Sequence, residues 1–384
     1  MEWRDFDVDG FLRDYWQQKP LLLKNPWRDW RNPLEPDELA GLACEEEVES
    51  RLVIHDAKRG KWTLENGPLP EQRFSRLPAN HWTLLVQAVD QWVPEVKALL
   101  QPFRFVPDWR IDDVMVSYAT DGGGVGPHFD QYDVFLIQGL GRRRWQVGER
   151  CGLDTELLEH QQLRLLKQFN ATQEWLLEPG DILYLPPRFA HNGIAEGENC
   201  MTYSIGFRAP SRADLVSHWC DHVLAGLSED DRYTDTALSS GAHSGEISQQ
   251  ALARLQQLAL ERLTDGAAFQ QWFGSYATTR KYPEFDDRPE QAIAPRTLRE
   301  RLRGGERLLK NPASRLAFIR QGTTDVLLFA DAQSWPCPLD LARKLCADSE
   351  FGESDLVADS AADTVLAALY NQGTLVFESD TGDF

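Results

Sequence analysis

The pattern of hydrophobic and polar residues changes near residue 111. From there to residue 208, short β-rich runs alternate with glycine and proline clusters. Many short strands with such punctuation predict an all-β barrel or jelly roll rather than alternating β and α units. The expected strands cover residues 114–118, 134–138, 144–147, 182–185 and 201–207.

Residues 1–110 combine short helical and strand-like segments. A brief helix is predicted over residues 9–16, and Lys19-Pro20 ends it. Residues 21–23 are three successive leucines, which leave no solvated face and predict a buried strand. Between residues 82 and 100, apolar side chains recur at helical spacing. This segment is predicted to be a helix that packs on the outside of the barrel.

The pattern becomes helical after residue 209. We expect one helix over residues 212–227, a polar loop over 228–246, and a longer helix capped by Ser248 that ends at Leu263. A helical segment between two domains serves either as an intrachain brace or as an oligomer contact. The pattern by itself favours the brace.

The last hundred residues predict a small α/β module. Residues 316–319 and 326–330 flank a turn and form a plausible hairpin. Helices are expected over 338–346 and 361–370, and a strand over 375–377. This order of elements suggests a winged helix.

The charge of this module argues against DNA binding. From Asp331 to Phe384 there are eleven acidic residues but only two basic ones, Arg343 and Lys344. A winged helix that reads DNA needs the reverse balance. We therefore expect a protein contact or a purely structural role, and no DNA partner.

Composition narrows the functional class further. The 384 residues suggest two or three domains, and the formal charge of −20 disfavours nucleic-acid binding while attracting a basic partner. The acidic start of the chain lacks a secretory signal core, and no apolar run approaches the length of a membrane span. The six cysteines are widely spaced and contain no Cys-x-x-Cys pair. We expect a soluble cytoplasmic protein with reduced thiols and no membrane association.

A metal-binding pattern lies within the predicted barrel. A glycine-rich segment ends in His128-Phe129-Asp130, the single His-x-Asp of the chain. On a strand these two side chains point to the same face. About sixty residues downstream, a glycine turn, one apolar strand and a proline turn lead to His191. Two imidazoles and one carboxylate form a facial triad that leaves three positions open, as in non-heme iron(II) oxygenases.

A chelating diacid needs a cation for its remote carboxylate. Arg142, Arg143 and Arg144 follow the His-x-Asp pattern, and one of them can point into the barrel while the others lie at the surface. Arginine pairs with a carboxylate through two hydrogen bonds, which suits this task. Asp121 and Asp133 are candidates to meet a substrate guanidinium, although surface solvation is the plainer role for both.

Two segments carry a resemblance to a known family. Residues 12–23, Leu-Arg-Asp-Tyr-Trp-Gln-Gln-Lys-Pro-Leu-Leu-Leu, and the glycine-rich run that continues through residues 127–139, Pro-His-Phe-Asp-Gln-Tyr-Asp-Val-Phe-Leu-Ile-Gln-Gly, resemble the bacterial JmjC-type ribosomal oxygenases. The resemblance extends over the whole chain. Members of this family use iron(II), 2-oxoglutarate and dioxygen to hydroxylate the C-3 position of an arginine in the large-subunit ribosomal protein L-sixteen, which is a basic partner.

The resemblance implies an architecture and a set of site residues. The architecture is a double-stranded β-helix, a helical dimerisation region and a C-terminal winged-helix-like domain, an α+β fold that is mainly β, with boundaries here at 1–210, 211–279 and 280–384. His128, Asp130 and His191 match the iron ligands. Arg143 matches the residue that binds the far carboxylate of 2-oxoglutarate, and Ser117 on the preceding strand is expected to assist this binding. A homodimer is also implied.

Three other functions stay open at this point. A metal-dependent cupin isomerase would consume no cosubstrate, and here Arg188 stands where cupins commonly carry glycine. A non-catalytic regulator would bind DNA through the winged helix, which the locally basic stretch 296–320 supports. Demethylation of lysine or arginine would use the same iron chemistry and release formaldehyde.

Overall fold

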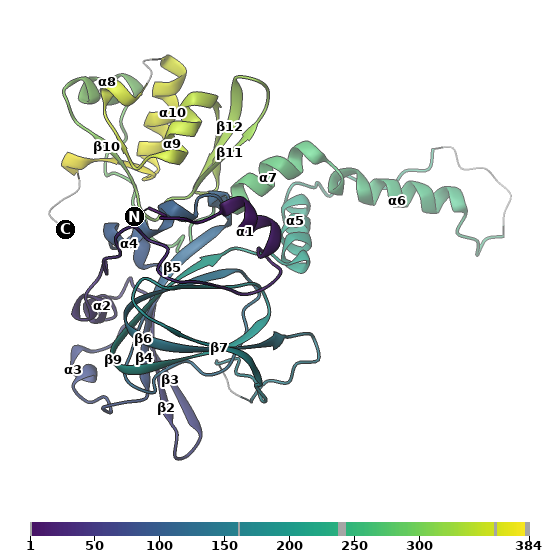
Figure 1. The fold of residues 1–384 in the computed structure, drawn as a ribbon. Helices are drawn as coiled ribbons and strands as arrows, with labels where there is room; N and C mark the ends of the chain where they lie inside the picture. Colours follow the sequence, from purple (N-terminus) through teal and green to yellow (C-terminus); the bar gives the residue numbers. More distant parts are fainter. Residues whose placement is uncertain (1, 160–161, 237–242, 357–358, 381–384) are drawn as a thin grey trace. The chain divides into compact units, whose positions relative to one another are not determined.

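The computed structural model describes residues 2–159, 162–236, 243–356 and 359–380. The chain divides into two compact units, Met1–Ala209 and Pro210–Phe384. Figure 1 shows strands concentrated in the first unit and most of the longer helices in the second. Among the described residues, no helix combines the length and the apolar character that crossing a membrane requires.

The first unit is built on one large antiparallel sheet. Its nine described strands follow the order β1-β8-β6-β9-β5-β4-β2-β3, and β7 pairs with β6. The strands are β1 Leu21–Leu23, β2 Ser50–Asp56, β3 Lys61–Asn66, β4 Trp82–Val86, β5 Ile111–Ala119, β6 Val134–Arg150, β7 Ala171–Leu177, β8 Ile182–Leu185 and β9 Phe189–Phe207.

The two longest strands close the sheet into a jelly roll. β6 and β9 pair along most of their lengths, with register shifts after Gln138, Leu140 and Val147. Such irregularities bend a strand, so each of these strands passes from one layer of the barrel to the other. The hydrophobic pattern predicts two separate strands over residues 134–138 and 144–147. They are the two halves of β6, because Gly139 and Gly141 bend the strand without ending it.

The helix predicted over residues 82–100 is wrong. Trp82–Val86 form strand β4, which pairs with β2 and β5. The remainder consists of short turns, η1 Val89–Gln91, α4 Pro94–Lys97 and η2 Ala98–Phe103. Adjacent apolar residues fit a helix face and a strand buried on both sides equally well, so periodicity could not decide between them. Here the pairing of Trp82–Val86 with β2 on one side and β5 on the other makes this segment a strand.

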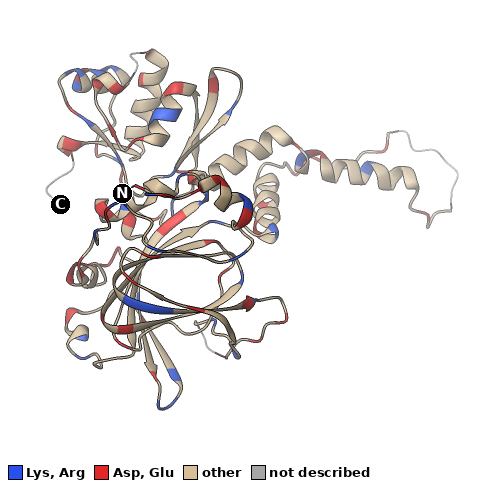
Figure 2. Cartoon of the chain, viewed as in Figure 1, with Lys and Arg blue, Asp and Glu red and all other residues tan. Residues whose placement is uncertain are grey.

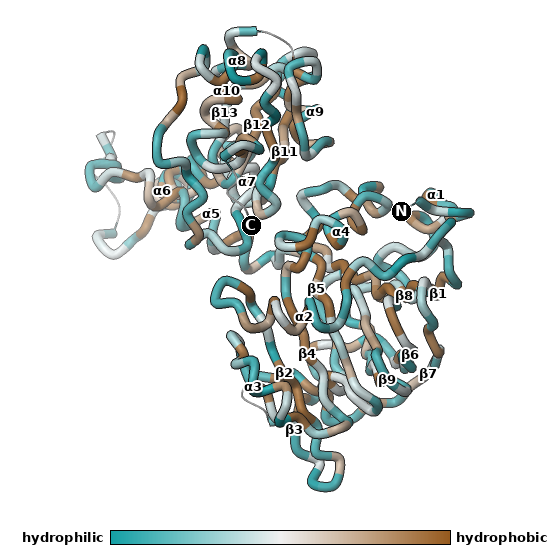
Figure 3. The backbone as a smooth tube through the Cα atoms, turned by 90° about the vertical axis from the view of Figure 1, so that its left-hand side faces the viewer, coloured by the Kyte–Doolittle hydropathy of each residue, from teal (hydrophilic) through white to brown (hydrophobic). Residues whose placement is uncertain are grey.

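Side chains alternate between the two faces of the sheet. Phe135 and Ile137 face outward, where they pack against the N-terminal helical segments, whereas Val134 and Leu136 face the barrel interior with Trp145. The other helical segments described in this unit are α1 Val8–Asp14, α2 Pro36–Leu42, α3 Glu71–Phe74 and η3 Asp108–Arg110. Figure 3 shows hydrophobic residues along the central strands.

The predicted N-terminal elements are present. The helix expected over residues 9–16 is α1, and Asp7 caps it by accepting a hydrogen bond from the Gly10 N–H. The three leucines form β1. This strand is half-buried rather than buried, because it lies at the edge of the sheet and pairs only with β8 among the described strands.

The first helices of the second unit are α5 Arg212–Ala225, α6 Gln249–Leu263 and α7 Gly266–Thr278. The first two match their predictions closely, and the Ser248 hydroxyl accepts a hydrogen bond from Ala251 N at the start of α6. We missed α7, because Asp265-Gly266 indicated the end of a helix, whereas Asp265 is in fact the N-cap of the next one. Part of the predicted polar loop, residues 237–242, lies outside the described residues.

The C-terminal module contains two three-stranded sheets packed with helices. One sheet has the order β14-β10-β15, and the other β11-β12-β13. The predicted hairpin is β11–β12, and the predicted helices and final strand are α9, α10 and β15. Its elements are α8 Pro295–Arg303, β10 Leu308–Lys310, β11 Leu316–Arg320, β12 Asp325–Ala330, β13 Gln333–Pro338, α9 Leu339–Ala347, β14 Glu350–Phe351, η4 Glu353–Asp355, α10 Ser360–Asn371, β15 Leu375–Phe377 and η5 Glu378–Asp380.

Helix α7 packs closely on the β11-β12-β13 sheet. A Cβ atom at Gly274 would lie 2.3 Å from the Phe329 ring, so only glycine allows this approach. The predicted domain boundary at residue 279 separates α7 from the sheet that it contacts. That boundary stays a prediction.

A buried loop residue fixes the start of β5. Asp90 accepts a hydrogen bond from the Val114 N–H at 2.7 Å, and Asp113 accepts one from the Ala88 N–H at 2.9 Å. The two carboxylates thus tie residues 87–90 to the bulge in β5. Burial raises the pKa of the Asp90 carboxyl to about 6, although its hydrogen bond with Val114 opposes this shift.

We predict that Asp90 makes stability depend on pH. Folded Asp90 holds its proton more tightly than the unfolded chain does, so this stabilisation is present below about pH 4 and is lost as the pH rises through about 6. In urea unfolding, the stability of the wild type relative to Asp90→Asn should fall by about 2–3 kcal/mol between these limits. The exposed Glu46→Gln variant is the control. If the free energies of unfolding of wild type and Asp90→Asn changed with pH by the same amount, the prediction would be contradicted.

Candidate metal centre and active site

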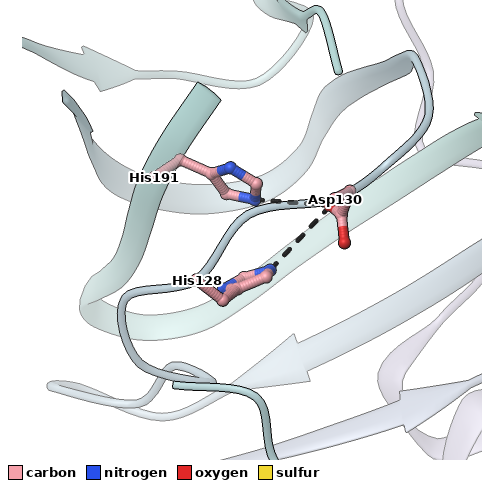
Figure 4. A group of neighbouring side chains, drawn as sticks. All are labelled: His128, Asp130 and His191. Atoms are coloured by element: carbon pink, nitrogen blue, oxygen red, sulfur yellow. Dashed lines mark ion pairs between the residues drawn. The ribbon is translucent and has the colours of Figure 1, made fainter. Parts of the chain in front are cut away.

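Three predicted ligands meet at one side of the barrel. His128 and Asp130 lie on the loop before β6, and His191 lies on β9 (Figure 4). One potential ligand atom from each residue lies within 4.8 Å of the other two. The Asp130 Oδ2 atom is 3.5 Å from His191 Nε2 and 4.0 Å from His128 Nε2.

The main chain holds the two histidines together. The His128 N–H donates to the His191 carbonyl at 3.0 Å, and the His191 N–H donates back to the His128 carbonyl at 2.8 Å. This pair of bonds attaches the glycine-rich loop to β9. The loop and the strand therefore present their side chains to the same point.

Hydrogen bonds also orient both imidazole rings. His128 Nδ1 lies 2.8 Å from the Gly126 carbonyl oxygen, and His191 Nδ1 lies 2.9 Å from that of Phe189. A proton on Nδ1 donates to the carbonyl and leaves the Nε2 lone pair for a metal. Burial lowers the pKa of His191 to about 4, and His128 adds to this shift while Asp130 opposes it. His191 is thus neutral at neutral pH, as a metal ligand must be.

Arg143 is the one arginine of its cluster that is buried. Its side chain is only 4% exposed, whereas Arg142 is exposed and Arg144 pairs with Glu174 and Glu196 near the surface. The Arg143 guanidinium lies 5.8 Å from the centre of the Trp145 ring, and that ring lies 5.9 Å from the His191 imidazole. Arg143 therefore belongs to the barrel interior next to the ligand cluster.

Two donors in this interior have no acceptor among the described residues. They are Arg143 Nη2 and Trp145 Nε1, both buried. No ion pair of Arg143 occurs in the described part of the chain. A buried guanidinium without an anion is costly. The interior is thus built to receive an anionic group, which fits a carboxylate of a chelating cosubstrate.

Ser117 occupies the same interior layer. It lies on β5, is 3% exposed, and its hydroxyl donates to the Thr202 carbonyl at 3.5 Å. The structure therefore brings the three ligands together and places Arg143 and Ser117 inside the same barrel. Their roles toward a metal or cosubstrate stay predictions.

Neither of the two aspartates suggested for substrate binding belongs to the ligand cluster. Asp133 is fully buried and accepts hydrogen bonds from Tyr184 Oη at 2.6 Å and Gln17 Nε2 at 2.9 Å, while Arg110 lies 3.6 Å away. It cannot meet a substrate, and its suggested surface role is also wrong, because it is buried and connects the turn after α1 to β8. Asp121 accepts a hydrogen bond from the Gly197 N–H at 2.7 Å and is exposed.

We missed Tyr132 and the carboxylates around it. Desolvation raises the pKa of the Tyr132 hydroxyl, and the carboxylates of Asp130, Asp113 and Asp112 raise it further. Tyr132 lies two residues after Asp130, and this proximity to the ligand motif is a signal in the sequence. The two β5 aspartates are distant in the chain, and only the fold brings them to this tyrosine.

Two sequence families match the chain. The JmjC domain matches residues 98–215, and the ROXA-like winged helix matches residues 261–376. Together with the jelly roll and its His-Asp-His cluster, these matches define an oxygenase of the JmjC class followed by a winged helix. The predicted fold class is confirmed.

Individual relatives narrow the class. The ribosomal protein uL16 3-hydroxylase of Escherichia coli K12 is 40% identical over 379 residues, which cover 98% of each chain. A probable ribosomal oxygenase of Haemophilus influenzae is 38% identical over 71% of this chain and 69% of its own length. The chain belongs to the JmjC ribosomal oxygenases, as its motifs predicted.

Solved structures of the E. coli relative agree with this assignment. The X-ray structure of E. coli ycfD has a TM-score of 0.88 at 39% identity and covers 98% of this chain and 100% of its own. A second structure, in complex with cobalt and 2-oxoglutarate, has a TM-score of 0.84 at 38% identity and covers 97% of this chain and 98% of its own.

We predict that metal binding requires all three clustered side chains. Asp130→Ala removes the one carboxylate and should weaken Co²⁺ or Mn²⁺ binding at least ~100-fold in calorimetry, because changes to groups that merely orient ligands already cost about 10–100-fold. Asp121→Ala makes the same chemical change outside the cluster and should bind like wild type. Equal affinities for the two variants would refute the assignment of Asp130 as a ligand.

Proposed function

We propose that the chain is an iron(II)- and 2-oxoglutarate-dependent hydroxylase that modifies an arginine side chain of ribosomal protein uL16 at its C-3 position. The observation that carries this proposal is the His128-Asp130-His191 cluster beside the buried guanidinium of Arg143, whose Nη2 has no acceptor among the described residues. The near-complete alignment with the E. coli uL16 3-hydroxylase supports the choice of substrate.

The triad would bind the metal, and Arg143 would bind the cosubstrate. The triad would hold iron(II) and leave positions for the keto-acid end of 2-oxoglutarate and for dioxygen, and Arg143 would pair with the far carboxylate. When bound, the metal and cosubstrate supply the oxidising chemistry that inserts oxygen into a C–H bond. The protein contributes orientation and a dry interior, which the layer around Val134, Leu136 and Trp145 provides.

Charge supports a basic substrate with a cationic target side chain. Figure 2 shows acidic residues spread over both units, in keeping with the net charge of −20. Near the site, Tyr132 is influenced by Asp130, Asp113 and Asp112. The acidic net charge favours a basic partner over a neutral one. A ribosomal substrate also fits the cytoplasmic location that we expect.

The regulator alternative loses its main support. The arginines of the basic stretch pair with acids, since Arg299 contacts Asp363, Arg301 contacts Glu306 and Asp380, and Arg307 contacts Glu350. These pairs neutralise the charge that a DNA surface would need. A cupin isomerase uses no diacid cosubstrate, so it would not explain why Arg143 Nη2 is buried without an acceptor among the described residues.

Mass spectrometry tests the proposed reaction. Purified uL16 incubated with the enzyme, iron(II) and 2-oxoglutarate should gain 16 Da on one arginine, which is the mass of one oxygen atom. Arg143→Ala should reduce the rate at low 2-oxoglutarate by about 100-fold, the order expected when a buried carboxylate loses its charged partner. Arg142→Ala, which removes an exposed neighbour, is the matched control.

Two results would overturn this proposal. Formaldehyde release with a loss of 14 Da, the mass of a CH₂ unit, would identify a demethylase. The absence of both succinate and a modified arginine would leave an isomerase or a binding protein.

We also propose that α5 and α6 form the contact of a homodimer. Helix α6 has no buried residue, although it carries several leucines. Of these, Leu252, Leu255 and Leu260 are 45%, 42% and 43% exposed. On α5, Val216 and Leu224 are 55% and 64% exposed. Apolar helix faces of this kind are normally covered.

Light scattering tests the dimer. The double variant Leu252→Glu/Leu255→Glu places two charges on the apolar face and should shift the protein from dimer to monomer at micromolar concentration. Gln250→Glu/Gln257→Glu adds the same charge on the polar side of α6 and should leave the dimer intact. A monomeric wild-type protein would refute the proposal.

A further inference from the structure

The Arg143 guanidinium is held by a neutral partner. Its Nε–H donates to the Cys200 sulfur at 3.3 Å, and Cys200 is fully buried. Gln138 Nε2 also lies 3.5 Å from this sulfur. Two N–H donors thus converge on one thiol, while Arg143 Nη2 keeps no partner among the described residues.

Gln138 is itself fixed in orientation. Its Nε2 donates to the Leu140 carbonyl at 2.7 Å, and its Oε1 accepts a hydrogen bond from the Thr202 hydroxyl at 3.3 Å. The amide therefore cannot rotate without losing both bonds. It presents its N–H toward Cys200 and restricts where the sulfur can lie.

The bulges in β6 create this arrangement. Residues 138 and 143 are an odd number of positions apart and would face opposite sides of a regular strand. The register shifts after Gln138 and Leu140 turn both side chains toward the same sulfur. Gly141 adopts a positive φ of 60° within this bend.

The choice of acceptor has a chemical consequence. A buried arginine is usually paired with a carboxylate, which orients it but also neutralises it. A thiol sulfur is a weak acceptor. It can orient the guanidinium while the positive charge and Nη2 stay available to a ligand.

We propose that Cys200, supported by Gln138, is a positioning residue for the far carboxylate of 2-oxoglutarate. It fixes the Arg143 guanidinium through a neutral contact and so preserves the charge that the cosubstrate needs. This inference rests on the proposed function, because it assumes that 2-oxoglutarate binds in this barrel.

The test measures cosubstrate affinity in full-length protein loaded with Mn²⁺ in the absence of oxygen. Cys200→Val keeps a similar volume but removes the acceptor, and should weaken 2-oxoglutarate binding about 10-fold. Cys200→Ser keeps an acceptor and should stay within about 3-fold of wild type. Cys200→Asp supplies an internal anion that neutralises Arg143 and should weaken binding by about 100-fold or more.

A second ligand separates positioning from general damage. Pyruvate has the keto-acid end of 2-oxoglutarate but lacks the far carboxylate, so Cys200→Val should leave its affinity unchanged. In turnover, Cys200→Val should raise the KM for 2-oxoglutarate and leave kcat within about 2-fold, since saturation restores the bound state. Thermal unfolding without ligand, with Cys151→Val as a control, checks that the variants are folded.

The binding results distinguish a failure of the proposed function from a failure of the inference about Cys200. If wild-type protein does not bind 2-oxoglutarate, the proposed function fails. If wild type binds and Cys200→Val or Cys200→Asp binds equally well, the inference about Cys200 alone is overturned. An equal loss of pyruvate and 2-oxoglutarate affinity in Cys200→Val would also overturn it, because the defect would then not concern the far carboxylate.

Discussion

The reciprocal main-chain hydrogen bonds between His128 and His191 are the constraint on which the active site depends. They attach a glycine-rich loop, which has no regular structure of its own, to the rigid strand β9. Once these two residues are paired, the position of Asp130 follows, because it lies only two residues further along the loop. The ring nitrogens are then oriented by carbonyl groups of the same two segments. Backbone pairing thus places the three ligand side chains at one point.

The barrel interior is divided into an apolar part and a polar part. Val134, Leu136 and Trp145 belong to a buried apolar cluster, and near them Arg143, Gln138, Cys200 and Thr202 form a connected polar network. A network buried in a low-dielectric interior is expensive unless its groups are satisfied. Within this network Arg143 Nη2 has no acceptor among the described residues, and the neighbouring Trp145 Nε1 of the apolar cluster has none either. The unfavourable free energy of burying these donors without acceptors therefore arises at the place where an anionic cosubstrate could accept hydrogen bonds from them.

The second unit shows how local charge can mislead. The stretch from residue 296 to 320 is rich in arginine, yet several of these arginines pair with acids that lie far away in the sequence, such as Asp363 and Asp380. Ion pairing turns a basic sequence into part of a folded acidic module. This agrees with a winged helix that serves protein architecture or protein contact, within a family whose relatives are named as ribosomal oxygenases.

The sequence by itself determined the strand-rich barrel, the ligand triplet, the candidate arginine and the order of the C-terminal elements. These features depend on local signals: short apolar runs, glycine and proline turns, and fixed spacing between histidine and aspartate. The tertiary structure decided what depends on partners distant in the chain. It made residues 82–86 a strand between β2 and β5, buried Asp133 in a hydrogen-bonded cluster, and brought Asp112 and Asp113 to Tyr132. It also buried Arg143 rather than its two neighbours and gave it Cys200 as a partner, because the bulges in β6, which depend on its pairing with β9, set which side chains face inward.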